Sequence, residues 1–79
     1  MKHIEVYSTP SCHWCKRAKA LLESQGLDYQ EVNISADTDR AREMEQRSGR
    51  RTVPQIFIDR EPIGGYGELL QLNNTGKLN

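Results

Sequence analysis

The sequence alternates between segments typical of β-strands and segments typical of helices, and this alternation limits the folds open to the chain. Residues 3–7 are rich in β-prone side chains and end at the turn-forming run Ser8-Thr9-Pro10-Ser11. Residues 16–25 then have the pattern of an amphipathic helix with Gly26 as its stop, and residues 29–34 return to the strand pattern. Because a whole helix separates the two strands, we expect them to pair in parallel as a β-α-β unit.

The second half of the chain predicts a further helix, a hairpin and a short final helix. Asp37 or Thr38 is a suitable N-cap, and Gly49 is a suitable stop. The helix is expected to run from this N-cap to about Ser48. A buried strand at 55–58, a turn at 59–61 and a brief strand at 62–64 should then form a hairpin. A last helix is expected after Gly64-Gly65, carrying Leu69, Leu70 and Leu72, and residues 73–76 should end it. The predicted order is β-α-β-α-β-β-α, in a single domain of residues 1–79.

Composition argues against several classes of partner. Lys plus Arg and Asp plus Glu both number 11, so the chain lacks the uniformly basic field of a nonspecific nucleic-acid or membrane binder. No apolar stretch approaches the roughly 20 residues of a membrane span, and no long apolar segment follows the N-terminus. We therefore expect a soluble, cytoplasmic protein that binds neither nucleic acid nor membrane.

The two cysteines, Cys12 and Cys15, are three positions apart. A disulfide between them closes too small a loop to stabilise a fold, so the pair is interpreted as chemically active. Zinc would need about four ligands, and His3 and His13 are the only other strong candidates, so we predict no metal site. A pair of inert core thiols is a further alternative, but a C-x-x-C beside a β-α-β pattern is typical of thiol–disulfide exchange.

The position of each cysteine on the expected helix gives the two sulfur atoms different properties. Cys12 stands at the helix start, where free backbone N–H groups and the positive end of the helix dipole favour a thiolate, and Lys16 and Arg17 add positive charge. Cys15 lies inside the helix and is expected to be less exposed and less acidic. We therefore expect Cys12 to be the nucleophile and Cys15 the resolving thiol that closes a disulfide with it. A protonated His13 would stabilise the Cys12 thiolate, although an exposed histidine without a special role is an equal alternative.

Two further motifs accompany the cysteine pair: Thr52-Val53-Pro54 before the third strand and Gly64-Gly65 before the last helix. With them the chain resembles the glutaredoxin family, and in particular small bacterial dithiol glutaredoxins, from Lys2 to Leu78. The resemblance implies a thioredoxin-like α/β fold with a four-stranded mixed sheet and three helices, and a cis peptide bond before Pro54. It also implies reduction of protein disulfides and glutathione mixed disulfides, with glutathione as co-substrate and no bound cofactor.

The resemblance further implies a groove for glutathione. The backbone of Val53 would pair with the cysteinyl part of glutathione, and the N–H groups of Tyr66 and Gly67 would hold the γ-glutamyl carboxylate. Taken without the cysteine pair, Thr52-Val53-Pro54 would more readily be interpreted as a plain strand start, and Gly64-Gly65 can be interpreted as only a turn. Trp14 is expected to be partly exposed and to contact glutathione, and to lie near the helix face of Ala18, Leu21 and Leu22. The expected glutathione-binding residues are Trp14, Thr52, Val53, Pro54, Gly65, Tyr66 and Gly67.

Some positions depart from the family pattern. Gly67 stands where the family usually carries an acidic residue that meets the γ-glutamyl ammonium, so that either Glu68 replaces it or that contact is lost. Arg47, Arg50 and Arg51 are expected to form a positive patch near the groove, with Arg51 as the candidate partner of the glycine carboxylate of glutathione.

Two other functions stay open. In the first, two Cys12 thiolates and two glutathione molecules would ligate a [2Fe–2S] cluster across a dimer, which Cys15 disfavours because it offers an internal disulfide. In the second, the chain would be reduced by thioredoxin reductase and serve ribonucleotide reductase, but residues 73–79 lack the aromatic and proline-bearing motif of that group. We expect a monomer whose partners are glutathione and disulfide-bonded or glutathionylated proteins, with ribonucleotide reductase as one candidate.

Overall fold

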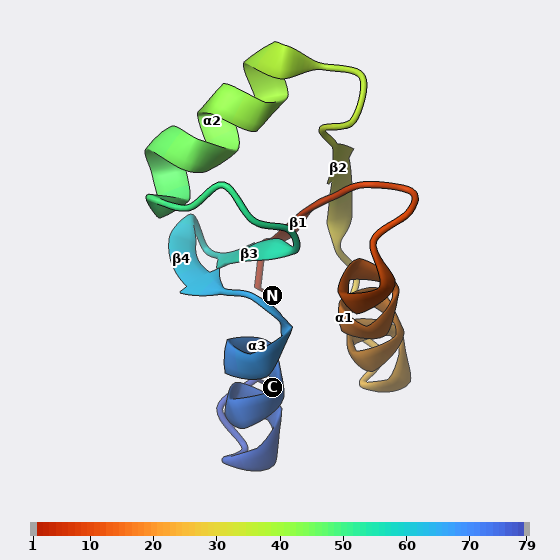
Figure 1. Cartoon of the computed structure of the whole chain (residues 1–79). Coiled ribbons are helices and arrows are strands. Elements are labelled where there is room, and N and C mark those ends of the chain that lie inside the picture. The colour runs from red at the N-terminus through yellow and green to blue at the C-terminus, as the bar shows by residue number, and fades with distance from the viewer. Residues whose placement is uncertain (1, 79) are drawn as a thin grey trace.

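The computed structural model describes residues 2–78 and places a four-stranded sheet between two layers of helices (Figure 1). The elements are β1 (Ile4–Ser8), α1 (His13–Ser24), β2 (Gln30–Asn33), α2 (Thr38–Ser48), β3 (Gln55–Ile58), β4 (Glu61–Gly64) and α3 (Tyr66–Asn74). Strand order in the sheet is β2-β1-β3-β4, with β1 and β2 parallel and the other two pairs antiparallel. The predicted element order and the mixed sheet are thereby confirmed. None of the helices in the described part of the chain is long and apolar enough to cross a membrane.

The two central strands have apolar side chains on both faces of the sheet. On one face, Ile4 and Val6 of β1 and Ile56 of β3 pack against α1 and α3. On the opposite face, Tyr7 and Phe57 pack against α2. Because helices cover both faces, every residue of β3 is buried, as the short apolar run at 55–58 predicted.

Helix α1 begins three residues before its predicted start at Lys16. Cys12 is the N-cap, and its Sγ accepts a hydrogen bond from the backbone N–H of Cys15 at 3.1 Å, so the helical turn already forms around the cysteine pair. Leu22 is fully buried in the core, whereas Trp14, which was expected near the same face, is 51% exposed. The start of α1 therefore presents Cys12 and Trp14 to the outside of the core.

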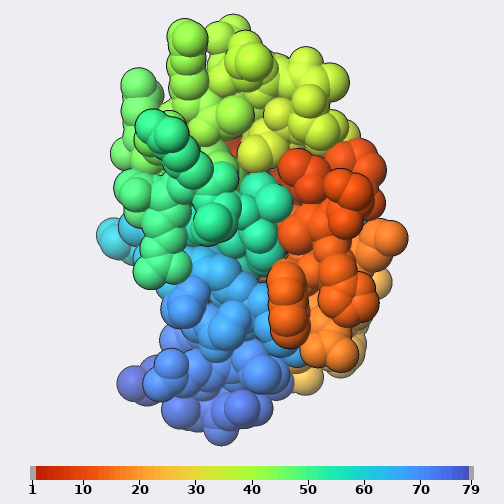
Figure 2. Space-filling model, in the orientation of Figure 1, coloured from red at the N-terminus to blue at the C-terminus, as the bar shows by residue number. Residues whose placement is uncertain are grey.

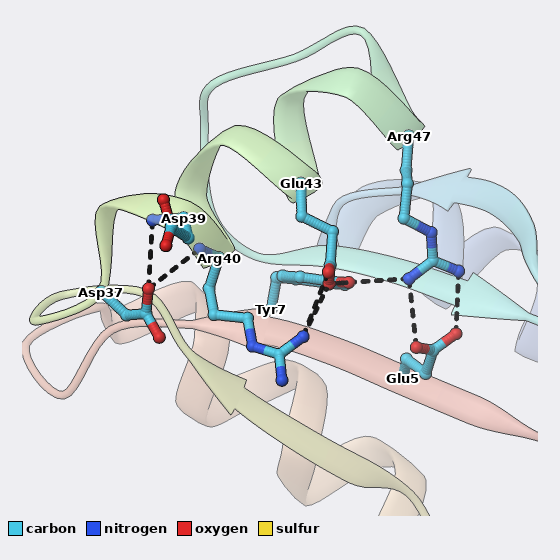
Figure 3. Close-up of polar contacts among 7 residues, drawn as sticks. All are labelled: Glu5, Tyr7, Asp37, Asp39, Arg40, Glu43 and Arg47. Carbon is cyan, nitrogen blue, oxygen red and sulfur yellow. Dashed lines mark hydrogen bonds and ion pairs between the residues drawn. The ribbon is translucent and has the colours of Figure 1, made fainter.

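Helix α2 has clear end signals and little apolar surface. Asp37 is its N-cap, with Oδ1 accepting the backbone N–H groups of Asp39 at 3.0 Å and Arg40 at 3.2 Å (Figure 3). Gly49 ends the helix in the left-handed conformation, with φ of 75°. Met44 is the one fully buried residue of α2, so polar contacts must also hold this helix on the sheet.

The β3–β4 hairpin turns on Asp59 and Arg60. Both residues have positive φ, 50° and 71°, which is the backbone geometry of a two-residue hairpin turn. Glu61, which the sequence placed in the turn, is the first residue of β4.

Candidate active site

The two cysteine side chains lie at the junction of β1 and α1, and both are free thiols. Cys12 is half-buried, and its thiol donates a hydrogen bond to the carbonyl oxygen of Val53, with a sulfur–oxygen distance of 3.7 Å. Cys15 is fully buried within the first turn of the helix. Of the two sulfur atoms, that of Cys12 is the one within reach of a substrate.

The environment of Cys15 keeps its thiol protonated at neutral pH. Burial raises the pKa of Cys15 to about 12, and the hydrogen bond with Cys12 acts in the same direction. The backbone of Thr9 and the charge of Lys19 oppose this shift. Lys19 Nζ also donates a hydrogen bond to Glu31 at 2.8 Å, which holds the pKa of that carboxyl below its usual range.

A groove of about 330 Å³ opens next to Val53, the residue whose carbonyl contacts Cys12. Figure 2 shows the face on which its segments meet: the start of α1 in orange, the chain around residues 50–56 in green to teal, and the start of α3 in blue. The structure brings together the seven residues that were predicted from the sequence to bind glutathione, while Arg51, the candidate partner of the glycine carboxylate, is not among the lining residues. The lining residues are Trp14, Arg50, Thr52, Val53, Pro54, Gln55, Gly65, Tyr66 and Gly67.

Aromatic side chains form one wall of the groove. The rings of Trp14 and Tyr66 lie 5.6 Å apart between centroids, at an angle of 32°. The guanidinium carbon of Arg17 lies 5.2 Å from the centre of the Trp14 ring, and the ring of His13 meets Trp14 edge-on. Trp14 therefore contacts neighbours on both sides while half of its surface stays exposed.

The segment before β3 forms the part of the groove nearest to Cys12. The Val53–Pro54 peptide bond is cis, as the family resemblance implied. The side chain of Gln55, which is almost fully buried, donates to the carbonyl oxygen of Thr52 at 3.0 Å and to its hydroxyl at 3.2 Å. Gln55 was not among the site residues predicted from the sequence. Its one signal was a polar residue at the head of an otherwise apolar strand.

The start of α3 approaches the Pro54 turn closely. A Cβ atom on Gly65 would lie 3.4 Å from the Pro54 carbonyl oxygen, and one on Gly64, which has φ of 121°, would collide with Glu68. The Glu68 carboxylate accepts the backbone N–H of Gly65 at 2.6 Å. Glu68 is thus engaged at the helix start and is not among the lining residues of the groove, which favours the alternative in which the acidic contact at position 67 is lost.

Of the three arginines expected beside the groove, only Arg50 lines it. Its Nη1 atom lies 3.5 Å from the carboxylate of Glu68, and both side chains are about half exposed. Arg51 is turned away and forms an ion pair with Glu45 at 2.9 Å. Arg47 points to the opposite face of the sheet. The cation next to the groove is therefore Arg50 and not Arg51.

These groups suit thiol–disulfide exchange. The reaction needs an accessible thiolate, a bound disulfide and a second thiol, all of which the Cys12–Cys15 pair and the adjoining groove can bring together. Within residues 2–78 no three or more His, Cys, Asp or Glu side chains are grouped as they are in a metal site.

Comparisons with known proteins agree with this geometry. The glutaredoxin family model matches residues 4–63. Glutaredoxin 3 of Escherichia coli (strain K12) is 47% identical over 78 residues, which cover 99% of this chain and 94% of that protein. The solution structure of a Brucella melitensis glutaredoxin is 43% identical, with a TM-score of 0.83 over 96% of this chain and 83% of that one. The crystal structure of a buckwheat glutaredoxin–glutathione complex is 31% identical, with a TM-score of 0.88 over 98% of this chain and 73% of that one.

The family match spans β1 to β4, and the relatives cover the rest of the described elements. The three motifs that carried the resemblance, at Cys12–Cys15, Thr52–Pro54 and Gly64-Gly65, meet around one groove. The chain therefore belongs to the glutaredoxin family and is a dithiol glutaredoxin, a glutathione-dependent thiol–disulfide oxidoreductase with Cys12 and Cys15 as its C-x-x-C active site.

Proposed function

We propose that Cys12 is the attacking thiolate, that Cys15 is the resolving thiol, and that the substrates are glutathionylated and disulfide-bonded proteins. The observation that carries the proposal is the difference between the two sulfur atoms. Cys12 caps α1 and is half-buried beside the groove, whereas Cys15 is fully buried, and burial raises its pKa to about 12. The N–H of Cys15, aimed at the Cys12 sulfur from 3.1 Å, stabilises negative charge on the attacking atom.

On a glutathionylated protein, the Cys12 thiolate attacks the glutathione sulfur, the substrate S–S bond breaks, and the protein thiolate leaves. Cys12 is then joined to glutathione by a disulfide. A second glutathione thiolate attacks the glutathione sulfur of this mixed disulfide, which releases glutathione disulfide and restores the Cys12 thiolate. Two glutathione units leave as the disulfide, and the protein regains its thiol.

On a protein disulfide, Cys12 first forms a mixed disulfide with one substrate sulfur. Cys15 then loses its proton to the departing substrate sulfur and attacks Cys12, so that the reduced substrate leaves and a Cys12–Cys15 disulfide forms. Two glutathione molecules reduce this internal disulfide and are themselves oxidised to glutathione disulfide. Because burial raises the pKa of Cys15, its attack requires that the proton be taken up, and the departing substrate sulfur is the group that takes it.

We further propose that glutathione lies in the groove as an extended tripeptide. In this proposal the backbone of Val53 pairs with the cysteinyl unit of glutathione, and the N–H groups of Tyr66 and Gly67 hold a carboxylate; the position of these residues in the lining of the groove and at the start of α3 supports it. Arg50 is the cation available to the second carboxylate. The buckwheat relative was crystallised as a complex with glutathione, which supports glutathione as the ligand.

The roles of the cysteines are tested by Cys12→Ser and Cys15→Ser in a coupled assay with glutathione, glutathione reductase and NADPH. Cys12→Ser should abolish turnover of a glutathionylated peptide, and Cys15→Ser should retain it while losing reduction of a protein disulfide. Turnover by Cys12→Ser would rule out Cys12 as the nucleophile. If thioredoxin reductase turns over the oxidised chain and glutathione does not, glutathione is not its co-substrate.

A further inference from the structure

A cluster of polar side chains lies on the α2 face of the sheet and takes no part in the steps above. We call Glu5, Tyr7, Glu43 and Arg47 the Arg47 cluster (Figure 3). The Arg47 guanidinium donates two hydrogen bonds to the Glu5 carboxylate, at 3.1 and 2.9 Å, and a third to the Tyr7 hydroxyl at 2.7 Å. The Tyr7 hydroxyl in turn donates to Glu43. One side chain of α2 is thus bonded to two residues of β1.

Arg47 also stacks on the buried aromatic side chains beneath it. Its guanidinium carbon lies 4.1 Å from the centre of the Phe57 ring and 5.7 Å from that of Tyr7. Tyr7 and Phe57 are fully buried and pack edge-to-face at 5.4 Å. The contact uses both the donor edges and the flat face of the guanidinium, which a lysine ammonium cannot reproduce.

These contacts hold the last turn of α2, which has few other ties to the sheet. Met44 is the only fully buried residue of the helix. The ion pairs Arg40–Glu43 and Arg51–Glu45 are local, so they stabilise the helix or its end without joining it to a strand. Among the described residues, Arg47 therefore makes more hydrogen bonds to the sheet than any other side chain of α2, and the Glu43 bond to Tyr7 adds one more.

The last turn of α2 leads directly into the groove. Segment 49–54 follows it and supplies Arg50, Thr52, Val53 and Pro54 to the lining. Val53 packs against the same buried cluster that includes Tyr7 and Phe57, and its carbonyl oxygen accepts the Cys12 thiol hydrogen bond. A continuous set of contacts thus runs from Arg47 through the aromatic rings to the residue next to Cys12.

We propose that Arg47 is a positioning residue for substrate binding: by holding the end of α2 on β1 and β3, it sets the place of segment 49–54 against Cys12. The inference rests on the groove proposed above as the glutathione site. Arg47 itself does not touch the groove, so its effect on binding is transmitted through the backbone and the aromatic rings.

The test compares Arg47→Gln with Arg42→Gln. Arg42 is on the same helix, is exposed, and makes no hydrogen bond to the sheet among the described residues, so its replacement removes the same charge and no positioning contact. For a glutathionylated peptide, Arg47→Gln should raise KM by about tenfold with a smaller change in kcat, because a displaced wall weakens binding. Arg42→Gln should leave both constants within about twofold of those of the parent chain.

A second readout follows the groove without using turnover. The side-chain amide of Gln55, bonded to Thr52, should change its NMR chemical shift in Arg47→Gln and not in Arg42→Gln. An unchanged Gln55 signal or an unchanged KM in Arg47→Gln would overturn the proposal. Recovery of the original KM by Arg47→Lys would also overturn it, because a positive charge without the guanidinium contacts would then be enough for substrate binding. If Arg47→Gln fails to fold, Tyr7→Phe is the second variant. It removes the hydrogen bond from Arg47 to the Tyr7 hydroxyl, together with the bond from that hydroxyl to Glu43, and should also raise KM.

Failure of the proposed function can be distinguished from failure of the Arg47 proposal. If the unaltered chain does not turn over glutathionylated peptide with glutathione, the groove assignment is wrong. The Gln55 signal still reports whether Arg47 places segment 49–54, because that measurement needs no substrate.

Discussion

Cys12 and Cys15 are the same residue type, one helical turn apart, and differ through burial and hydrogen bonding. Cys12 occupies the cap, where a backbone N–H is directed at its sulfur. Cys15 sits on the inward face of α1, where burial raises its pKa to about 12. The i, i+3 spacing makes these two environments neighbours, as the proposed roles of attacking and resolving thiol require.

Trp14 is the large exposed apolar side chain of the site, and its replacement should affect binding more than chemistry. Trp14→Ala removes the ring that lies beside Tyr66 in the aromatic wall of the groove, so the KM for a glutathionylated peptide should rise by about threefold to tenfold with kcat little changed. Trp14→Phe, which keeps an aromatic face, should recover most of the loss. Steady-state kinetics on the three proteins measure this, and an unchanged KM in Trp14→Ala would show that the ring is not a contact.

Individual site residues were predictable where the backbone position alone decides the role. Cys12 at a helix start and Gly65 at a close approach are cases of this kind, because turn and cap signals are local in sequence. The roles of Arg47, Arg50 and Arg51 could not be predicted in this way, because these three side chains, although close in sequence, point in different directions where α2 ends. Arg47 bonds to Glu5, 42 positions away, and no local pattern marks such a partner.

Among the elements, the predicted boundaries were least accurate at α1. The apolar period predicted a start at Lys16, but the cap bond from Cys15 to Cys12 starts the helix at His13. Trp14 satisfied the same period as Leu22 and yet is half exposed, because its neighbours are Tyr66 at the start of α3 and Arg17 rather than core side chains. The apolar period of a sequence shows which residues share one face of a helix, but only the tertiary fold decides what each part of that face packs against.

Helix α2 depends on its caps because it buries so little. Asp37 accepts two backbone N–H groups of the first turn, so Asp37→Ala should lower the free energy of unfolding by about 1 kcal/mol. Asp37→Ser, which retains a capping oxygen, should lose much less. Urea denaturation followed by circular dichroism measures both variants, and equal stability of Asp37→Ala and the parent chain would mean that the cap contributes nothing to α2.

At the level of the whole molecule, the element order was predictable because strands and helices alternate with different apolar periods. The pairing of β1 between β2 and β3 follows in part from the helix that separates the first two strands. The polar contacts between the helices and the sheet could not be predicted, because no pattern in the sequence marks their partners. Glu5–Arg47 joins β1 to α2, and Lys19–Glu31 joins α1 to β2.

These carboxylates give the folded chain a defined response to acid. Hydrogen bonds from Arg47 lower the pKa of Glu5 from its ordinary value of 4.5, and a hydrogen bond from Lys19 does the same for Glu31. Because each folded-state pKa lies below the unfolded value, the stabilisation is fully present above that value and is lost as the pH falls through the folded pKa. The free energy of unfolding should therefore be level from pH 7 to about pH 5 and decrease below it.

Glu5→Gln separates this specific effect from the general positive charge that the chain acquires in acid. The variant should be less stable than the parent at pH 7 and should lose less stability between about pH 5 and pH 3, so that the two curves converge. Urea unfolding at a series of pH values measures both. Parallel curves for the two proteins would mean that the Glu5–Arg47 contact has no part in acid unfolding, and that repulsion among the 11 Lys and Arg residues accounts for it.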